Sequence, residues 1–294
     1  MKGANQYRVR PRSGLLPVSA SDLVQQAVPD VVICSDLWSA GPDQCAVPVG
    51  PPDWSHGPHP SSRARQTAAS HKLLPAEVFR WLSQAREPDI RAAVAGNPAV
   101  PSSVLRELSH DEDRQVCIAV AGNPNTSAET LSRLACHPDI EIRKTTAGNT
   151  NIDPAVLLQI IRDTDSLRYV AAGNSVCPPE HLERFSCDPA LAVRRRVARN
   201  LSTPVGTLDR LAADSEWQVR QNVAENPNSP DAALSKLAVD PEHLVRMLAA
   251  RHRNTPDRAL CSLLQDPDPV IAETAAANPN VPRAVLAMWQ LARN

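Results

Sequence analysis

The chain has 294 residues, with 31 Lys and Arg against 32 Asp and Glu, which gives a formal net charge of -1. This balance disfavours a strongly basic nucleic-acid coat and an acidic disordered tail, and no apolar run is long enough to cross a bilayer. Aromatic residues make up only 3% of the chain. A core must therefore be built mostly from Leu, Val, Ile and Ala, which suits many thin stacked layers.

Residues 1–70 form a Pro-rich head without any repeat, and their composition predicts a disordered or loosely folded segment. The head contains four side chains of types that zinc accepts, at Cys34, Cys45, His56 and His59, but only the two His are closely spaced, so no metal site is expected. The head has no apolar stretch of signal-peptide length, and the seven cysteines include no C-x-x-C pair. These features predict a cytoplasmic protein with free thiols.

From about residue 71 to residue 294 the sequence repeats every 26 residues, with one interval of 25. The repeat is easiest to follow on one polar position, here called the landmark position. Its residues are Asn97, Asn123, Asn149, Asn174, Asn200, Asn226, His252 and Asn278. A Leu stands eight residues after each landmark, and a large apolar residue follows three positions later. These leucines are Leu105, Leu131, Leu157, Leu182, Leu208, Leu234, Leu260 and Leu286.

A spacing of three residues puts both apolar positions on one face of a helix. A second apolar row lies seven residues before each landmark, and Ala stands two residues before it, which predicts a second short helix. Helices this short are not stable alone in water, so the units must stack. The sequence predicts an all-α solenoid of about eight 26-residue, two-helix repeats over residues 71–294, preceded by the head at residues 1–70.

Helix ends are indicated by recurring turn residues. Thr203, Ser229 and Thr255 each precede a Pro and are interpreted as N-caps of first helices. The landmark Asn is interpreted as a cap that tolerates the left-handed conformation at the end of the second helix. The glycines just before it in the first four units are interpreted as helix-end residues with a conformational role. They are Gly96, Gly122, Gly148 and Gly173.

The pattern V-R-x-x-V-A-x-N-P-N-x-P-x-x-x-L-x-x-L-A-x-D, at Val219 to Asp240, resembles the variant leucine-rich repeat, a short bacterial repeat related in form to HEAT repeats. The resemblance covers about Leu73 to Asn294 and implies alternating α and 3₁₀ helices stacked into a right-handed superhelix. Founding members of the family carry a cysteine-bound iron-sulfur domain before the repeats. The head offers only Cys34 and Cys45, which cannot hold a four-cysteine cluster, so no cofactor is expected.

Arg occupies the position six residues before the landmark in six units, and Asp recurs fourteen residues after the landmark. These arginines are Arg91, Arg143, Arg168, Arg194, Arg220 and Arg246, and the aspartates are Asp111, Asp163, Asp188, Asp214, Asp240 and Asp266. One interpretation is a structural series of Arg–Asp pairs that fixes the stacking register. The other is a groove for anions.

The main functional prediction is a non-catalytic scaffold that binds a protein partner on its concave face. The candidate contact residues are Arg195, Arg199, Trp217, Arg251 and Arg253. The alternative is a nucleic-acid or anion reader with an Arg-rich strip. A continuous positive groove would favour the alternative, and alternating charge would favour the scaffold.

Evidence for catalysis in the sequence is weak. The chain has no phosphate-binding loop, no G-x-S-x-G and no H-E-x-x-H motif. Asp214 and Trp217 form an Asp-x-x-Trp of the kind that a helical-repeat DNA glycosylase could use, but one such pair does not predict an enzyme. Cys136 and Cys187 share a repeat position two units apart and are interpreted as small core residues.

Overall fold

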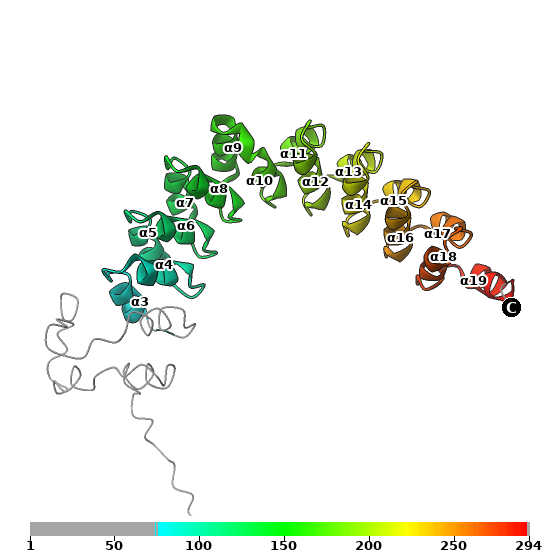
Figure 1. The fold of residues 1–294 in the computed structure, drawn as a ribbon, viewed down its shortest axis with the longest axis horizontal. Coiled ribbons are helices and arrows are strands. Elements are labelled where there is room, and N and C mark those ends of the chain that lie inside the picture. The colour runs from blue at the N-terminus through cyan, green and yellow to red at the C-terminus, as the bar shows by residue number, and fades with distance from the viewer. Residues whose placement is uncertain (1–73, 75, 293–294) are drawn as a thin grey trace, which may run out of the picture. The chain divides into compact units, whose positions relative to one another are not determined.

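The computed structural model describes residue 74 and residues 76–292, and every regular element in this part is helical (Figure 1). The predictions for the head at residues 1–70, including those for Cys34, Cys45, His56 and His59, lie outside the described residues. The chain divides into two compact units, residues 1–120 and 121–294, which are described separately. No helix of the described residues combines the length and apolar character needed to span a membrane.

In the first unit, short helices alternate between two roles. The helices are α3 (Ala76–Leu82), α4 (Pro88–Gly96), α5 (Ser102–Leu108) and the beginning of α6 (Arg114–Gly122). Odd-numbered helices are the predicted first helices of each repeat and even-numbered helices are the second. Phe79, Leu82, Ile90 and Leu105 from these helices are fully buried and form the core between them.

The second unit continues the same alternation. Its first helices are α7 (Ala128–Leu134), α9 (Pro154–Asp163), α11 (Pro179–Phe185), α13 (Val205–Leu211), α15 (Asp231–Leu237), α17 (Asp257–Leu263) and α19 (Arg283–Leu291). Its second helices are α8 (Ile140–Gly148), α10 (Arg168–Gly173), α12 (Leu191–Arg199), α14 (Trp217–Glu225), α16 (His243–Arg251) and α18 (Pro269–Ala276). The predicted all-α, two-helix repeat is confirmed.

The predicted column of leucines forms the core of the repeats. Seven of the eight leucines have no exposed surface, and Leu286 in α19 is partly buried against the last repeat. Removing one such side chain from water stabilises the fold by about 1.5–3 kcal/mol. Each repeat therefore depends on its neighbours, because a pair of short helices cannot enclose these side chains alone.

Within the second unit, successive second helices pack closely against each other, whereas successive first helices have fewer contacts. Figure 1 shows the second helices, α8, α10, α12, α14, α16 and α18, following one another along one side of this unit and the first helices along the other. Because the second helices are spaced more tightly, their side of this unit is concave. The solvent-facing surface of these second helices, the even-numbered helices from α8 to α18, is called the second-helix face below.

Two expectations about helix type and helix ends were wrong. Both helices of each repeat are α-helical in the described residues, and a 3₁₀ helix (Asp165–Leu167) occurs before α10, so the α/3₁₀ alternation implied by the resemblance is not found. Thr203, Ser229 and Thr255 are not N-caps. Their buried hydroxyls donate to carbonyls of the preceding second helix, as in Thr203 Oγ1 to Val197 O at 2.6 Å.

The cysteine prediction was also wrong in part. Cys136 and Cys187 are exposed, because their repeat position directly follows the last turn of a first helix, outside the core. Cys117 and Cys177 are buried instead, and burial, the largest cause, raises the pKa of the Cys177 thiol to about 12. All five described cysteines are free thiols.

Candidate functional site

The landmark Asn connects each repeat to the one before it. In Asn226, Nδ2 donates to Ala198 O at 2.8 Å and to Asn200 O at 3.2 Å, and Oδ1 accepts the Asn228 N–H at 2.9 Å. Asn226 is the C-cap of α14, as expected, but it is buried and its backbone is extended, with φ -75° and ψ 118°, so the expected left-handed conformation was wrong. The same donors and acceptors recur down the second unit. This asparagine ladder consists of Asn149, Asn174, Asn200, Asn226 and Asn278.

His252 takes the place of Asn in the seventh repeat and makes fewer contacts. Its Nε2 lies 3.0 Å from Asn226 O, and its Nδ1 accepts the Asn254 N–H at 3.1 Å. Because Nδ1 must accept a proton while Nε2 donates one, both contacts require the neutral imidazole. Burial lowers the pKa of His252 below its ordinary value of 6.5; the bond to Asn226 O opposes this, and Arg253 adds to it.

Substituting His252→Asn should make the stability of the array less dependent on pH. Since the folded-state pKa is lowered, the contribution of His252 is complete above pH 6.5 and is lost as the pH falls below that value, because the unfolded chain binds the proton first. The free energy of unfolding of the variant should exceed that of the wild type by a margin that grows on acidification, by at most about 1.4 kcal/mol per pH unit. Urea titrations at about pH 7.5 and about pH 5.5 measure this margin, and a margin independent of pH would contradict the prediction.

The arginines six residues before the landmark make structural contacts between repeats. Arg220 Nε and Nη2 donate to the two carboxylate oxygens of Asp240 at 2.6 and 3.0 Å, and Nη1 donates to the carbonyls of Asp214 and Ser215. Equivalent ion pairs join Arg91 to Asp111, Arg168 to Asp188, Arg194 to Asp214 and Arg246 to Asp266. Arg143 instead uses the carbonyls of His137 and Pro138. These contacts support the structural interpretation and leave the paired guanidinium groups unavailable for an anion groove.

In two of these pairs, Arg91–Asp111 and Arg246–Asp266, both members keep their charges at ordinary pH. Burial acts to raise the pKa of Asp111, but hydrogen bonds from Arg91 and from the Asp113 amide outweigh it and lower the pKa below its usual value. The pKa of Asp266 is lowered in the same way by Arg246. Bidentate pairs with fixed geometry between adjacent repeats hold the stacking register more firmly than single exposed ion pairs do.

The structure separates the sequence-predicted contact residues into two places. Arg195 and Arg199 are exposed on one face of α12, and Arg251 is exposed at the end of α16, followed by Arg253 in the next turn. Trp217 is 39% exposed but lies at the first residue of α14, the end opposite to the arginines that precede the landmark. Its supposed catalytic neighbour Asp214 is held by Arg194 at 2.8 Å and is not free to act.

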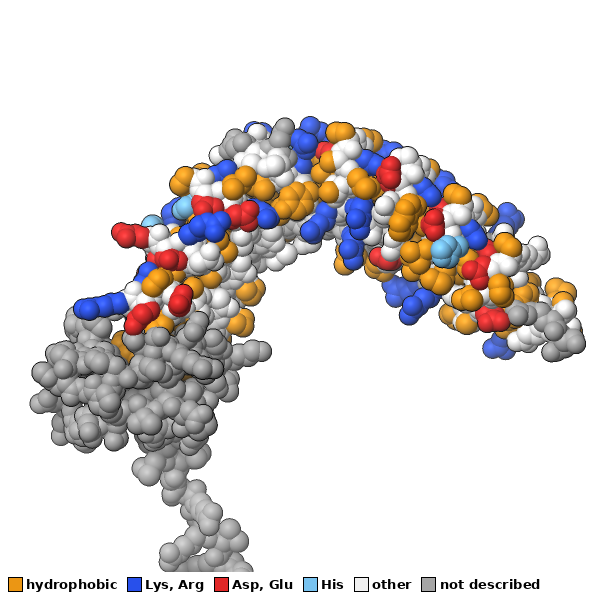
Figure 2. Space-filling view, viewed as in Figure 1, with side chains coloured by type: hydrophobic (Ala, Val, Ile, Leu, Met, Phe, Trp, Pro, Cys, Tyr) orange, Lys and Arg blue, Asp and Glu red, His pale blue; other side chains and the backbone are white. Residues whose placement is uncertain are grey.

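Charge alternates along the second-helix face. The residue before the landmark is Arg199 in α12, Glu225 in α14 and Arg251 in α16. Figure 2 shows Lys and Arg side chains interspersed with Asp and Glu side chains along the second unit. The arginines therefore do not form one continuous positive strip.

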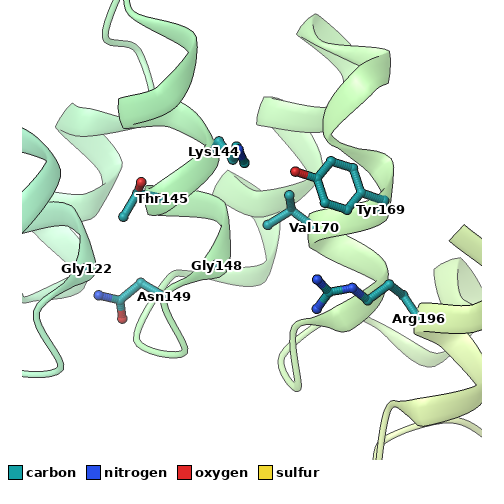
Figure 3. A pocket seen from close by; sticks show the side chains of 8 residues that line it. All are labelled: Gly122, Lys144, Thr145, Gly148, Asn149, Tyr169, Val170 and Arg196. Atoms are coloured by element: carbon teal, nitrogen blue, oxygen red, sulfur yellow. The ribbon is translucent and has the colours of Figure 1, made fainter. Parts of the chain in front are cut away.

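A hollow of about 360 Å³ opens on the second-helix face where α8, α10 and α12 lie next to one another (Figure 3). Its lining residues are Gly122, Lys144, Thr145, Gly148, Asn149, Tyr169, Val170 and Arg196. Arg196 places its guanidinium carbon 6.0 Å from the centre of the Tyr169 ring, within the range of a cation–π contact. In Figure 3 the Tyr169 hydroxyl points toward Lys144, while the guanidinium of Arg196 points back toward Gly148.

Gly122 and Gly148 line this space. All four glycines before the landmark end their helices, as expected, but their interpretation as conformational residues was wrong. None of them has a positive φ, and Arg199, Glu225 and Arg251 occupy the same position in later repeats. A Cβ on Gly148 would meet only Val170 Cγ1, at 3.8 Å, whereas a Cβ on Gly173 would lie 3.1 Å from Arg196 Nη1. The missing side chains let Arg196 lie across α10 and leave the hollow open.

Sequence reasoning missed Lys144, Tyr169 and Arg196 as a group, because they occupy repeat positions where each unit differs. The row of glycines in the first four units, replaced by charged residues in the next three, was the signal that could have located the hollow. Among the residues that the structure describes, no group of three or more His, Cys, Asp or Glu side chains is placed to hold a metal ion.

The paired helices, leucine column and asparagine ladder define an α-helical solenoid built from two-helix repeats. Residues 88–113 and 217–242 match the family model described as leucine rich repeat variant. These matched segments share their register with the other repeats of this chain, which are similar to the leucine-rich repeat variant.

Several solved structures resemble this chain. One is described as a leucine-rich repeat variant with a novel repetitive protein structural motif; it is 29% identical, with a TM-score of 0.47, and the match covers 73% of this chain and 82% of that chain. Two engineered proteins are each 18% identical, with TM-scores of 0.38 and 0.30, and their matches cover 72% and 74% of this chain and 82% and 96% of theirs. Comparison with curated proteins gives no match.

Proposed function

We propose that the chain is a non-catalytic scaffold that binds a protein partner on the second-helix face, in the reducing cytoplasm of a bacterial cell. The observation that carries this proposal is the set of exposed arginines on that face, with alternating charge between them. Arg195, Arg199 and Arg251 are exposed, and none of the described carboxylates forms an ion pair with them. Their charges are therefore available to a partner.

The construction of the repeats supports this role. Stacking is fixed by the leucine column, by the asparagine ladder and by the Arg–Asp pairs, all of which lie in the core or between repeats. Residues on the second-helix face can therefore vary without disturbing the core, as is typical of solenoids that bind partners along an extended concave surface.

A nucleic-acid or anion reader remains the second candidate because of one helix. Arg195, Arg196 and Arg199 are exposed on α12, which contains no acidic residue. Phosphate contacts would use such a cluster. Glu225 on the next second helix interrupts it, which favours a protein partner with its own mixed charges.

Charge reversal at Arg195, Arg199 and Arg251 together should reduce recovery of the native partner at least about tenfold in a quantitative pulldown from the host. The reason is that like charges facing across an interface cost several kcal/mol, whereas tenfold in affinity needs only about 1.4. The matched control reverses Arg162, Arg184 and Arg258, three exposed arginines of first helices, and should keep full recovery. Circular dichroism checks that both variants are folded. Equal recovery by both variants would contradict the proposal, and a labelled oligonucleotide shifted at low salt only by the wild type would favour the second candidate.

A further inference from the structure

We propose that the hollow between α8, α10 and α12 binds the carboxylate side chain of an extended acidic peptide segment, with Arg196 and Lys144 as the cationic contacts. This inference rests on the proposed function, since it specifies what the partner presents to one part of the second-helix face. It adds a defined subsite and residues that the sequence did not single out.

The charges around the hollow favour an anion. Arg196 lies over the Tyr169 ring, with its guanidinium carbon 6.0 Å from the ring centre, and forms no ion pair with any described carboxylate, so its charge faces the opening. Lys144 is partly neutralised by Glu141, with an Nζ to Oε2 distance of 3.0 Å and both groups well exposed. Arg195 and Arg199 extend the positive charge along α12. A carboxylate entering the hollow would therefore meet more positive than negative charge.

The shape of the hollow suits a side chain that enters from a passing chain. Gly122 and Gly148 leave its edge open, and the space in front of α10 is lined by Tyr169 and Val170. The ring and the methyl groups can contact the methylene groups of a Glu side chain. The cations on either side, shown in Figure 3, can then bind the carboxylate at its end.

A peptide fits these features better than a nucleic acid does. Arg196 lies over one face of the Tyr169 ring, 6.0 Å from the ring centre, and competes with a base for that face. Glu141 beside Lys144 and Glu225 on α14 would repel a chain with a phosphate at every step. A peptide can place its carboxylates at intervals and bring polar or basic residues to the acidic positions.

The test uses a fluorescein-labelled twelve-residue peptide of alternating Glu and Gly as the probe, with a Gln and Gly peptide of equal length as its neutral counterpart. Fluorescence anisotropy with the full chain should show binding of the Glu peptide and at least about tenfold weaker binding of the Gln peptide. Arg196→Gln should weaken binding of the Glu peptide about tenfold, because one charge-assisted contact is lost. The control Arg184→Gln removes an exposed arginine from the first helix α11 and should leave binding unchanged.

A second pair of variants tests the space rather than the charge. Gly148→Leu puts a side chain into the hollow at a position where other repeats hold Arg or Glu, so the fold should tolerate it. Binding of the Glu peptide should weaken about tenfold, as for the loss of one contact. Gly96→Leu makes the same change at the same repeat position in α4, where a Cβ meets nothing within 4 Å, and should leave binding unchanged.

The inference is overturned if the wild type does not bind the Glu peptide, if the Gln peptide binds equally well, or if neither Arg196→Gln nor Gly148→Leu weakens binding. Tighter binding of a single-stranded oligonucleotide that depends on the same two residues would also overturn it, in favour of a phosphate site. If Arg196→Gln and Gly148→Leu do not weaken peptide binding, but triple charge reversal still abolishes recovery of the native partner, the proposed scaffold function stands without this subsite. If the hollow binds the peptide while triple reversal changes nothing, the proposed function is wrong and the subsite stands.

Discussion

Replacing Asn226 with Ala should lower the free energy of unfolding by about 3 kcal/mol, one of the largest losses for a single polar side chain in the array. The side chain donates to Ala198 O and Asn200 O, and accepts the Asn228 N–H. Asn226 and its two donated hydrogen bonds are buried, so water does not replace the lost donor. Each buried group left without a partner costs about 1–3 kcal/mol, and part of that cost is relieved when the site relaxes.

Two comparisons separate this contribution from ordinary surface effects. Asn228→Ala removes one exposed hydrogen bond, from Nδ2 to Leu201 O at 2.8 Å, and should cost less than about 1 kcal/mol. Asn226→His should cost less than Asn226→Ala, because His252 shows that imidazole retains one donor and one acceptor at this position. Urea denaturation followed by circular dichroism gives all three values. Equal losses for Asn226→Ala and Asn228→Ala would show that the ladder does not hold the repeats together.

The ladder also explains why the repeat period is so regular. A donor that reaches two fixed carbonyls of the preceding repeat works only if the distance between consecutive repeats is constant. Asn174 keeps the same two contacts, to Ala147 O and Asn149 O, although its repeat is one residue shorter than the others. That repeat differs at the start of its second helix, where the 3₁₀ helix at Asp165–Leu167 precedes α10. The missing residue is thus absorbed away from the ladder.

The sequence predicted the parts of the fold in which both partners are side chains that repeat. The leucine column follows from its spacing, and the Arg–Asp pairs follow because Arg and Asp recur twenty residues apart, as in Arg220 and Asp240. In such pairs, both partners are visible in the sequence as residue types that recur at a fixed spacing. A structural role for both could therefore be proposed before any coordinates.

In a contact between a side chain and the backbone, only the side-chain partner is visible in the sequence. The partners of Asn226 are carbonyl groups, which every residue possesses, so the sequence showed that Asn recurs but not what it binds. The hydroxyl of Thr203 was misassigned for the same reason, since its acceptor is Val197 O. The hollow was missed because Lys144, Tyr169 and Arg196 come from three different repeats, at repeat positions where the residue type changes from unit to unit.

Leu208→Ala should produce the largest loss of all, about 3–4 kcal/mol in the free energy of unfolding. Leu208 has no exposed surface and packs in the core cluster that runs through the middle repeats of the second unit. Truncation removes buried methyl groups and leaves a cavity that flanking helices fill only in part. Leu201→Ala, at a side chain that is 61% exposed, is the matched control and should change stability by less than about 0.5 kcal/mol.

The location of the damage is a sharper test than its size. Stability in a stacked array is approximately a sum of repeat and nearest-neighbour contributions, so a cavity at Leu208 weakens α13 and its neighbours first. Amide hydrogen exchange should therefore accelerate most in α11 to α15, while α7 and α8 keep most of their protection. Uniform acceleration over residues 121–292 would instead show that this unit unfolds as one cooperative block, and that the leucine column couples distant repeats more strongly than nearest-neighbour packing allows.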